Sequence, residues 1–411
     1  MSTRFEELRA PLASRPFRAL MAAQIASQLG DWAARLALAL LVLERTGSPW
    51  LTSVTIAVTL LPWVGIGQLL ASLGDRYGRR RTMIVCDSGR ALIFGVLALV
   101  HLPIPIVLLL AFIAGCLDPP FEAARSATIP SLVPADDYPD AIAVSTALNQ
   151  TALLLGYALG GGLVGLVGAQ GALGVNSATF VLSSLLLLRI PADRGQPGSK
   201  LIRIAPAFRV IRVDPVIAHA LLSFCAIAFF AMAAEGLVAP FTTDVVGLSK
   251  IEVGFVAAMV TVGTILGTFV LRVRGDDLRL LRLTGLLGVI GGVGAMITFS
   301  LSESRPVAYI GYFWIGVAFL ASLTANAAAG RRIPAGVRAS TFAILQAAVI
   351  GSHALGALAG GAVAEAWDIR SALLLASGFT AIAGVGGLLT VPRSAAPAAP
   401  DSAEDRATSE R

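Results

Sequence analysis

Four polar residues follow one face of the first long hydrophobic segment, residues 17–43. Gln24, Gln28, Asp31 and Arg35 occur at i, i+4, i+7 and i+11, which places them on one side of an α-helix. Hydrocarbon cannot solvate such a stripe, so we expect it to face a bundle interior or a wet cavity. Asp31 could exchange a proton, with Arg35 tuning its acidity. Alternatively, the two residues form a static ion pair or contact a bound molecule.

A second polar face lies in the hydrophobic segment 104–126. Asp118, Glu122 and Arg125 follow i, i+4 and i+7, and Pro119-Pro120 interrupts the segment. The prolines should break or kink a helix there, because they remove backbone hydrogen bonds. Two acids beside one base leave a carboxylate that could hold a proton when desolvated, as in a proton relay or gate. The alternative is that Glu122 and Arg125 are solvated at the membrane interface.

Isolated polar residues occur in other hydrophobic segments. Glu235 is the only acid in 216–240 and either lines a cavity or lies near the outer interface. Asn149 and Gln346 are candidates for a cavity lining, although ordinary hydrogen bonds between helices explain them equally well. His353 could shuttle protons, but it could also be a packing residue.

The composition indicates a membrane protein. Hydrophobic residues make up 56% of the 411 residues and charged residues only 14%, whereas soluble domains are about 45–50% apolar and about a quarter charged. A membrane-spanning helix needs roughly 20 apolar residues. Hydrophobic windows predict twelve such helices, over residues 17–43, 51–72, 82–101, 104–126, 140–168, 172–190, 216–240, 251–272, 281–301, 306–329, 339–364 and 371–391.

The distribution of basic residues predicts the orientation. With twelve spans both termini lie on one side, and 25 of the 31 Lys and Arg residues of the chain lie on that side. The exceptions in the connections are Arg45, Lys250, Arg305 and Arg370. By the positive-inside rule, both termini are therefore expected to be cytoplasmic.

The sequence repeats weakly at an offset of 200 residues. Pro134 corresponds to Pro334, and three glycines of the fifth predicted span correspond to three of the eleventh. The helix-packing glycines of this repeat are Gly156, Gly160, Gly161, Gly356, Gly360 and Gly361. Six spans per repeat predict two parallel, pseudo-symmetric six-helix bundles, over 1–190 and 216–392, with a midplane site between them. The linker 191–215 is expected to end in a short amphipathic helix on the cytoplasmic surface, and the tail 393–411 to be disordered.

The connection between the second and third spans carries a family signature. It reads LGDRYGRRR from Leu73 to Arg81 and contains Gly74, Asp75, Arg76, Gly78, Arg79 and Arg80. This segment resembles the GxLaDRxGRR loop of the major facilitator superfamily, with Ala71 in place of the first Gly. The resemblance implies that the loop latches the two halves on the cytoplasmic side, with Asp87 and Arg90 in the same gating network. The alternative is that its charges only fix the topology.

Further motifs are similar to those of the drug-exporter branch of that superfamily, which includes macrolide and enterobactin-type siderophore exporters. Gly156 to Gly161 reads GYALGG, similar to the antiporter motif GPxxGG with Tyr157 in place of Pro. The other matching stretches are Gly30-Asp31, Thr46–Pro49 and Ile129–Pro134. The resemblance implies alternating-access export of a small amphipathic or hydrophobic compound, a drug or siderophore-like molecule.

The expected energy source is a proton gradient, because the sequence has no GxxxxGK[ST] loop for ATP and no other cofactor is expected. The transport candidates are accordingly Asp31, Arg35, Asp118, Glu122 and Glu235. An importer or uniporter of a metabolite is the alternative. Neither an enzyme nor a metal site is expected, because there are three histidines and no catalytic or ligand motif. We expect a monomer in the inner (plasma) membrane, whose partners are a small-molecule substrate and the lipid bilayer, without nucleic acid.

Overall fold

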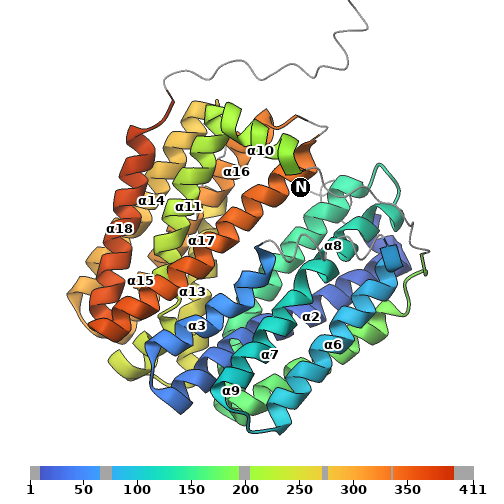
Figure 1. Cartoon of the computed structure of the whole chain (residues 1–411), viewed down its shortest axis with the longest axis horizontal. Coiled ribbons are helices and arrows are strands. Elements are labelled where there is room, and N and C mark those ends of the chain that lie inside the picture. The colour runs from blue at the N-terminus through green and yellow to red at the C-terminus, as the bar shows by residue number, and fades with distance from the viewer. Residues whose placement is uncertain (1–9, 65–75, 194–203, 271–275, 335–336, 393–411) are drawn as a thin grey trace, which may run out of the picture. The chain divides into compact units, whose positions relative to one another are not determined.

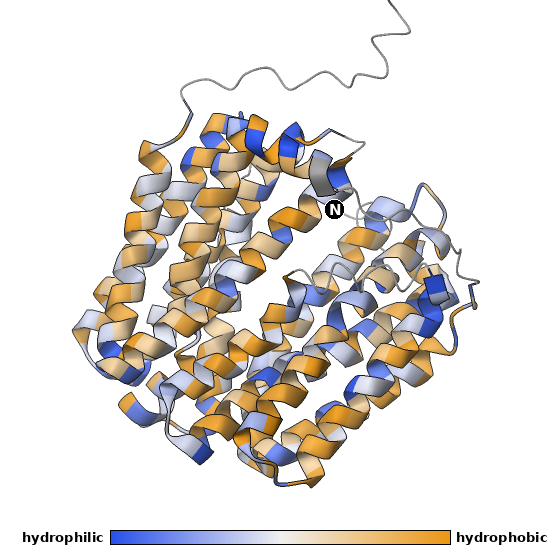
Figure 2. Cartoon of the chain, viewed as in Figure 1, coloured by the Kyte–Doolittle hydropathy of each residue, from blue (hydrophilic) through white to orange (hydrophobic). Residues whose placement is uncertain are grey.

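The computed structural model is helical, with no β-strand among the residues that it describes, 10–64, 76–193, 204–270, 276–334 and 337–392 (Figure 1). Ten of its helices are long and apolar enough to cross a membrane. One of these, α9 (Tyr138–Leu187), contains two predicted spans, and α3 (Pro49–Leu60) with η2 (Leu61–Trp63) is the described part of another. Each of the twelve predicted spans is therefore represented. Figure 2 shows hydrophobic residues along most of the helix lengths.

The helices form two compact units. Unit 1 comprises Met1–Ser199 and Val238–Thr261, and unit 2 comprises Lys200–Leu237 and Val262–Arg411. The predicted bundle boundaries instead assign Val238–Thr261 to the second half. The segment groups with unit 1 because its helix α13 (Lys250–Val270) packs closely there. A Cβ atom on Gly161 would lie 2.6 Å from the backbone nitrogen of Gly254, so only glycines allow this approach.

Unit 1 begins with a helix, α2 (Arg15–Thr46), whose ends are specified locally. Ser14 caps α2, since its hydroxyl accepts a hydrogen bond from the backbone N–H of Phe17 at 3.4 Å, and Pro16 favours the first turn. Gly47 ends the helix in the left-handed region with φ of 63°. The other helices of unit 1 besides α9 include α6 (Arg79–Leu99), α7 (Ile104–Cys116), α8 (Asp118–Thr128) and α12 (Val238–Pro240), together with the π-helical turn η4 (Phe241–Val245).

The fourth predicted span is broken at Pro119-Pro120, where the sequence predicts a break or kink. α7 ends at Cys116, and α8 begins at Asp118 with Pro119 and Pro120 in its first turn. Proline fits the first turn of a helix because the N–H groups there have no partner within the helix. The break places Asp118 at the start of a new helix instead of in the middle of a continuous one.

The fifth and sixth predicted spans meet at one glycine. Within α9, Gly168 has φ of 75° and ψ of 169°, outside the helical region. Glycine adopts this conformation without the steric cost that a Cβ atom would impose. The run Tyr138–Leu187 is therefore two helices joined without a loop, whereas the predicted spans 140–168 and 172–190 leave a short connection between them.

Unit 2 is also a helix bundle. Its helices are α10 (Ile204–Val213), α11 (Pro215–Glu235), α14 (Asp277–Leu301), α15 (Arg305–Phe319), α16 (Ala321–Arg332), α17 (Arg338–Ala366) and α18 (Ile369–Leu389), with the second half of α13. The α10 helix confirms the amphipathic helix predicted in the linker. Asp214 separates α10 from α11 and caps the latter, accepting hydrogen bonds from the backbone N–H groups of Val216 and Ile217 at 2.8 and 3.3 Å.

Candidate functional site

The main polar cluster of unit 1 is centred on Arg90 of α6. Its Nη1 atom lies 2.9 Å from Asp31 Oδ2 on α2 and 3.3 Å from Asp118 Oδ1 on α8, and its Nη2 atom donates to Asp87 one turn earlier on α6. The Arg90 side chain is only 2% exposed and Asp87 is fully buried. Three helices are thus joined through one guanidinium group. We call Asp31, Arg35, Asp87, Arg90 and Asp118 the charged cluster.

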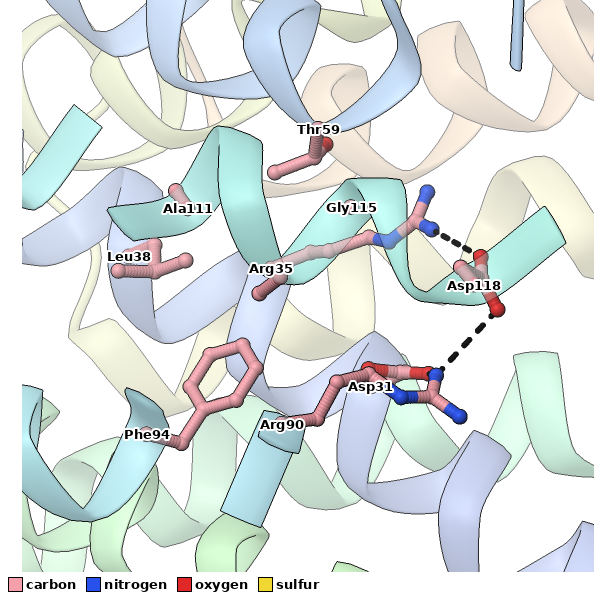
Figure 3. A pocket seen from close by; sticks show the side chains of 10 residues that line it. Asp31, Arg35, Leu38, Thr59, Arg90, Phe94, Ala111, Gly115 and Asp118 are labelled. Carbon is pink, nitrogen blue, oxygen red and sulfur yellow. Dashed lines mark hydrogen bonds and ion pairs between the residues drawn. The ribbon is translucent and has the colours of Figure 1, made fainter. Parts of the chain in front are cut away.

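Arg35 completes the charged cluster from the other side of Asp118. Its Nη2 atom lies 3.5 Å from Asp118 Oδ2, which also accepts a hydrogen bond from Trp63 Nε1 at 3.2 Å. Figure 3 shows Asp118 linked to the guanidinium groups of both Arg35 and Arg90. One alternative from the sequence was an ion pair between Asp31 and Arg35 along α2. In the structure, Asp31 pairs with Arg90 and Arg35 pairs with Asp118, so both pairs cross between helices. Asp31 of α2 and Asp118 of α8 are each held by a base from another helix.

Two aromatic rings hold the Arg90 guanidinium. Its central carbon lies 4.8 Å from the ring centre of Phe121 and 4.5 Å from that of Phe180. Both rings are almost completely buried. A guanidinium over an aromatic face is attracted by the ring quadrupole, and most strongly where water is excluded. These contacts fix the position of the positive charge between its carboxylates.

The charged cluster has more acids than bases. Its three carboxylates, Asp31, Asp87 and Asp118, face two guanidinium groups, so the fully ionised cluster carries one net negative charge. A single net charge among membrane-spanning helices is costly, because neither lipid nor packed side chains solvate it well. One proton bound to a carboxylate makes the cluster neutral.

A pocket opens onto the charged cluster within unit 1 (Figure 3). Its volume is about 330 Å³, which includes space that is open to solvent. The lining joins polar and apolar groups: Asp31, Arg35, Leu38, Thr59, Arg90, Phe94, Ala111, Ala114, Gly115 and Asp118. Asp31 and Asp118 line this pocket together with Leu38 and Phe94, so water or a small group can reach the two carboxylates.

A second buried network joins α2, α8 and α9, nearer the start of α2. Arg125 of α8 donates to Gln24 Oε1 at 3.0 Å and to Ser145 Oγ at 2.7 Å, and it forms an ion pair with Glu122. Arg125 and Gln24 are buried, so the alternative that Arg125 is simply solvated is wrong. Glu122 is 28% exposed and is not part of the charged cluster. Asp118 and Glu122, predicted together, thus belong to separate networks.

The remaining polar candidates of unit 1 make fewer contacts. Gln28 lies between the two networks along α2, and its Oε1 atom is buried with no hydrogen-bond partner among the described residues. Asn149 on α9 is half-buried. The polar stripe predicted on α2 is therefore present, but Gln24 and Asp31 serve different networks.

The predicted gating loop is described only from Arg76 onward, and Gly74 and Asp75 lie outside the described residues. Gly78 has φ of 93°, a value that favours glycine, and precedes α6. The backbone N–H groups of Arg79 and Arg80 donate to the Asp193 carboxylate at 2.9 and 3.2 Å. Asp193 was not among the predicted site residues, because no spacing pattern links residues 114 positions apart.

Two residues that the sequence grouped with the loop lie elsewhere. Asp87 and Arg90 are in the charged cluster with Asp31 and Asp118. They start two turns or more into α6, whose buried face carries them away from the loop and into the bundle. Sequence reasoning also missed the Phe121 and Phe180 rings. In the sequence, a phenylalanine that contacts a guanidinium group looks the same as one that only packs in the core.

The polar candidates of unit 2 are scattered. Glu235 is half-buried at the end of α11, and the hydroxyl of Tyr312 donates to the neighbouring Ala234 carbonyl at 3.1 Å. Gln346 is exposed on α17. His353 lies against the Phe319 ring, 5.5 Å between centres, and its Nε2 atom has no hydrogen-bond partner among the described residues.

Comparisons with known proteins agree with this architecture. A family model described as Major Facilitator Superfamily matches residues 20–349. Among curated proteins, the uncharacterized MFS-type transporter YfiS of Bacillus subtilis (strain 168) is 25% identical over 371 residues, covering 87% of this chain and 88% of that protein. YkuC, another uncharacterized MFS-type transporter of that bacterium, is 28% identical over 190 residues, 45% of this chain and 44% of YkuC.

Solved structures share the fold at lower identity. A bacterial homologue of the human lysosomal transporter Spinster, inward-facing and occupied, has a TM-score of 0.75 at 15% identity and covers 91% of this chain and 95% of its own. The nucleoside transporter NupG has a TM-score of 0.70 at 12% identity, covering 91% and 99%. At these identities the likeness concerns the fold alone.

Proposed function

Because the chain belongs to the major facilitator superfamily, a family of membrane transporters, we propose that it exports a small amphipathic or hydrophobic compound in exchange for protons. The observation that carries the proton coupling is the charged cluster, in which three carboxylates face two guanidinium groups beside a pocket. Export rests on the similarity of Gly156–Gly161 to the antiporter motif of exporters. In this proposal the protein is a monomer in the plasma membrane, with cytoplasmic termini and no cofactor.

The charged cluster can couple protonation to helix movement. Asp31 and Asp118 both face the pocket, while Asp87 is fully buried behind Arg90. A proton on Asp31 or Asp118 removes the negative charge that attracts the guanidinium of Arg90 or Arg35. The ion pairs between α2, α6 and α8 then weaken, and these helices can adopt a second arrangement. A transporter that alternates between two states needs an element of this kind, whose equilibrium the transported ion shifts.

The proposed compound has an apolar body, and the pocket places apolar side chains directly beside the charged groups. Its lining contains Leu38, Phe94 and two alanines next to the charged groups. An ion gradient can drive such a compound only if loading of the compound and of the proton are linked. In the proposed cycle, the charged cluster holds a proton or the compound is bound beside it, but not both at once. The loop at Arg76–Arg80 serves as the latch in this proposal, with Asp193 securing the start of α6.

The test is transport in everted membrane vesicles that contain wild type or Asp31→Asn. A panel of fluorescent amphipathic dyes and labelled siderophores is added with an imposed proton gradient, with and without a protonophore. We expect accumulation that the protonophore abolishes and that Asp31→Asn loses. Asp136→Asn is the matched control, because it removes an exposed carboxylate from the connection before α9 and should leave accumulation unchanged.

Three results would contradict the proposal. Accumulation that survives the protonophore excludes proton coupling, and accumulation retained by Asp31→Asn excludes the charged cluster as its site. Uptake only in right-side-out vesicles reverses the direction and supports the alternative, an importer of a metabolite. Surface expression of both variants is measured in parallel, so that loss of protein is not mistaken for loss of coupling.

A further inference from the structure

Helix α10 lies across the ends of helices in its own unit. Its buried residues Ala207 and Ile211 are one turn apart, and the helix packs on α17 and α11. Figure 1 shows α10 running across the ends of the bundle helices of unit 2 and not along them. One face of α10 is therefore used for packing, and the opposite face is left to its surroundings.

The outer face of α10 combines apolar and basic side chains. Phe208 is 50% exposed and Val213 is 73% exposed. Arg209 and Arg212 are also exposed, and neither forms an ion pair within the described residues. A face directed only to water would normally carry few large apolar residues next to its charges. Aromatic and aliphatic side chains interleaved with arginine are typical of helices in a membrane interface.

The junction with α11 fixes α10 at the level of the membrane surface. Asp214 follows Val213 directly, caps α11 and forms an ion pair with Arg332 at 2.9 Å. α11 begins a candidate membrane span at Pro215. The last residue of α10 is therefore two residues from a membrane-spanning helix, and the ion pair ties this junction to the end of α16.

The same end of unit 2 is rich in exposed arginine. Arg332 joins the ends of α11 and α16 to the start of α14, since it also lies 3.7 Å from Asp277. Arg279 and Arg282, in the first turns of α14, are exposed at this end but do not belong to the outer face of α10. The guanidinium group binds phosphate in a bidentate manner, with two parallel hydrogen bonds.

We propose that the outer face of α10 is a binding surface for the headgroups of anionic phospholipids. Arg209 and Arg212 bind the phosphates, and Phe208 and Val213 contact the apolar part of the same lipids. Charge complementarity and the position beside a membrane span both select lipid as the occupant. The surface is independent of the charged cluster, and the inference does not depend on the direction of transport.

The test uses the purified full-length protein in detergent, titrated with phosphatidylglycerol or phosphatidylcholine and followed by native mass spectrometry. We expect the wild type to retain phosphatidylglycerol in preference to phosphatidylcholine. Arg209→Gln with Arg212→Gln should weaken phosphatidylglycerol binding by at least about tenfold, since each basic residue near an anionic surface contributes measurably. The matched control is Arg279→Gln with Arg282→Gln, which removes the same charge from α14 and should change binding by less than about threefold.

Several outcomes overturn the proposal. Equal retention of the two lipids by the wild type shows no headgroup recognition. Equal losses of phosphatidylglycerol binding in both double variants show that arginines around this end of unit 2 bind the lipid without any preference for α10. Displacement of phosphatidylglycerol by inorganic phosphate shows a free-anion site. Phe208→Ser is a second variant that leaves the charges intact, and it should weaken retention of both lipids, whereas an unchanged retention removes the apolar part of the proposal.

Discussion

In unit 1, Gly156 and Gly160 of α9 lie against Leu29 and Ala33 of α2. In unit 2, the glycines of α17 lie against Phe229 and Ala233 of α11, so each contact recurs at an offset of 200 residues. A Cβ atom added to Gly160 would be 2.8 Å from the Ala33 Cα, and one added to Gly360 would be 2.9 Å from the Ala233 Cα. The two units therefore repeat the same close helix contact.

The side chains attached to this shared framework differ. At the same offset, Ala231 stands in place of Asp31, Leu287 in place of Asp87 and Ile290 in place of Arg90. Glu235 replaces Arg35, and α15 and α16 contain no acidic residue. The close helix contact is thus common to both units, whereas the charged cluster of unit 1 has no counterpart at the corresponding positions of unit 2 that the structure describes. The close helix contact can form with or without the charged residues, because the packing glycines and the charged residues occupy different positions in the helices.

Removing the hub of the charged cluster should have the largest effect. Arg90→Gln leaves three carboxylates with one guanidinium, and losing one partner of a buried ion pair costs about 3–5 kcal/mol. We expect a large loss of folded protein and a lower thermal unfolding temperature for the purified variant. The comparison is Arg332→Gln in unit 2, whose partners Asp214 and Asp277 are each 16% exposed and keep some water.

Arg90→Lys is the matched variant for that prediction. It retains the positive charge but cannot reach two carboxylates in a fork or stack between Phe121 and Phe180 in the same way. Its stability should lie between those of Arg90→Gln and wild type. If Arg90→Gln is as stable as wild type, the charged cluster does not hold α2, α6 and α8 together.

The second prediction compares the acids of the two units. Asp31→Asn should lower proton-driven accumulation by about 100-fold, equivalent to about 2.7 kcal/mol. Glu235→Gln should lower it by less than about threefold, because Glu235 is the only acid of α11 and lies outside the charged cluster. Initial rates in everted vesicles measure both. Equal losses would place the coupling in both units and remove the contrast between them.

Much of the fold could be predicted from sequence because it depends on local signals. Hydrophobic length predicts the spans, Pro119-Pro120 predicts the break before α8, and glycine periodicity predicts the repeat. The meeting of two spans at Gly168 was not predicted in detail. A glycine among many in α9 gives no sign that its φ is positive.

The site could be predicted only in part because ion pairs join distant residues. The stripe on α2 correctly suggested that Asp31 faces the bundle interior, since lipid cannot solvate it. The partner of Asp31 is 59 positions away on α6, and nothing in the local pattern selects Arg90 over Arg35. Proximity along the chain suggested Arg35 as one possible partner of Asp31, and it also grouped Arg90 with the loop.

The third prediction tests the shared framework. Gly160→Ala and Gly360→Ala each place a Cβ within 3 Å of a neighbouring backbone, and each should destabilise the protein by about 1–3 kcal/mol. Gly360→Ala should cost more than Gly160→Ala, because its Cβ would lie closer to the Ala233 carbonyl oxygen than the 2.8 Å that separates a Cβ at Gly160 from its nearest atom. Gly162→Ala is the control, since a Cβ there meets nothing within 4 Å. Denaturation in detergent measures all three, and a loss at 160 or 360 no larger than that of Gly162→Ala would show that the close contact does not stabilise that unit.

The smallest predicted effect concerns how each unit begins its third helix. In unit 1, Gly78 precedes α6 without a capping side chain, and the Asp193 carboxylate accepts from the Arg79 and Arg80 N–H groups instead. In unit 2, the local residue Asp276 caps α14 by accepting from the Arg279 N–H at 3.1 Å. Asp193→Ala and Asp276→Ala should each cost about 1 kcal/mol of stability.

Hydrogen exchange distinguishes the two caps better than stability does. Asp276→Ala removes an acceptor within its own helix start, so faster exchange should be confined to the amides of residues 277–280. Asp193 lies beyond the end of α9, so Asp193→Ala should speed exchange both at residues 79–82 and at residues 188–190, where α9 ends in a short turn. Faster exchange at 79–82 alone would mean that the end of α9 is held by its own packing. The carboxylate would then cap α6 without coupling the two helices.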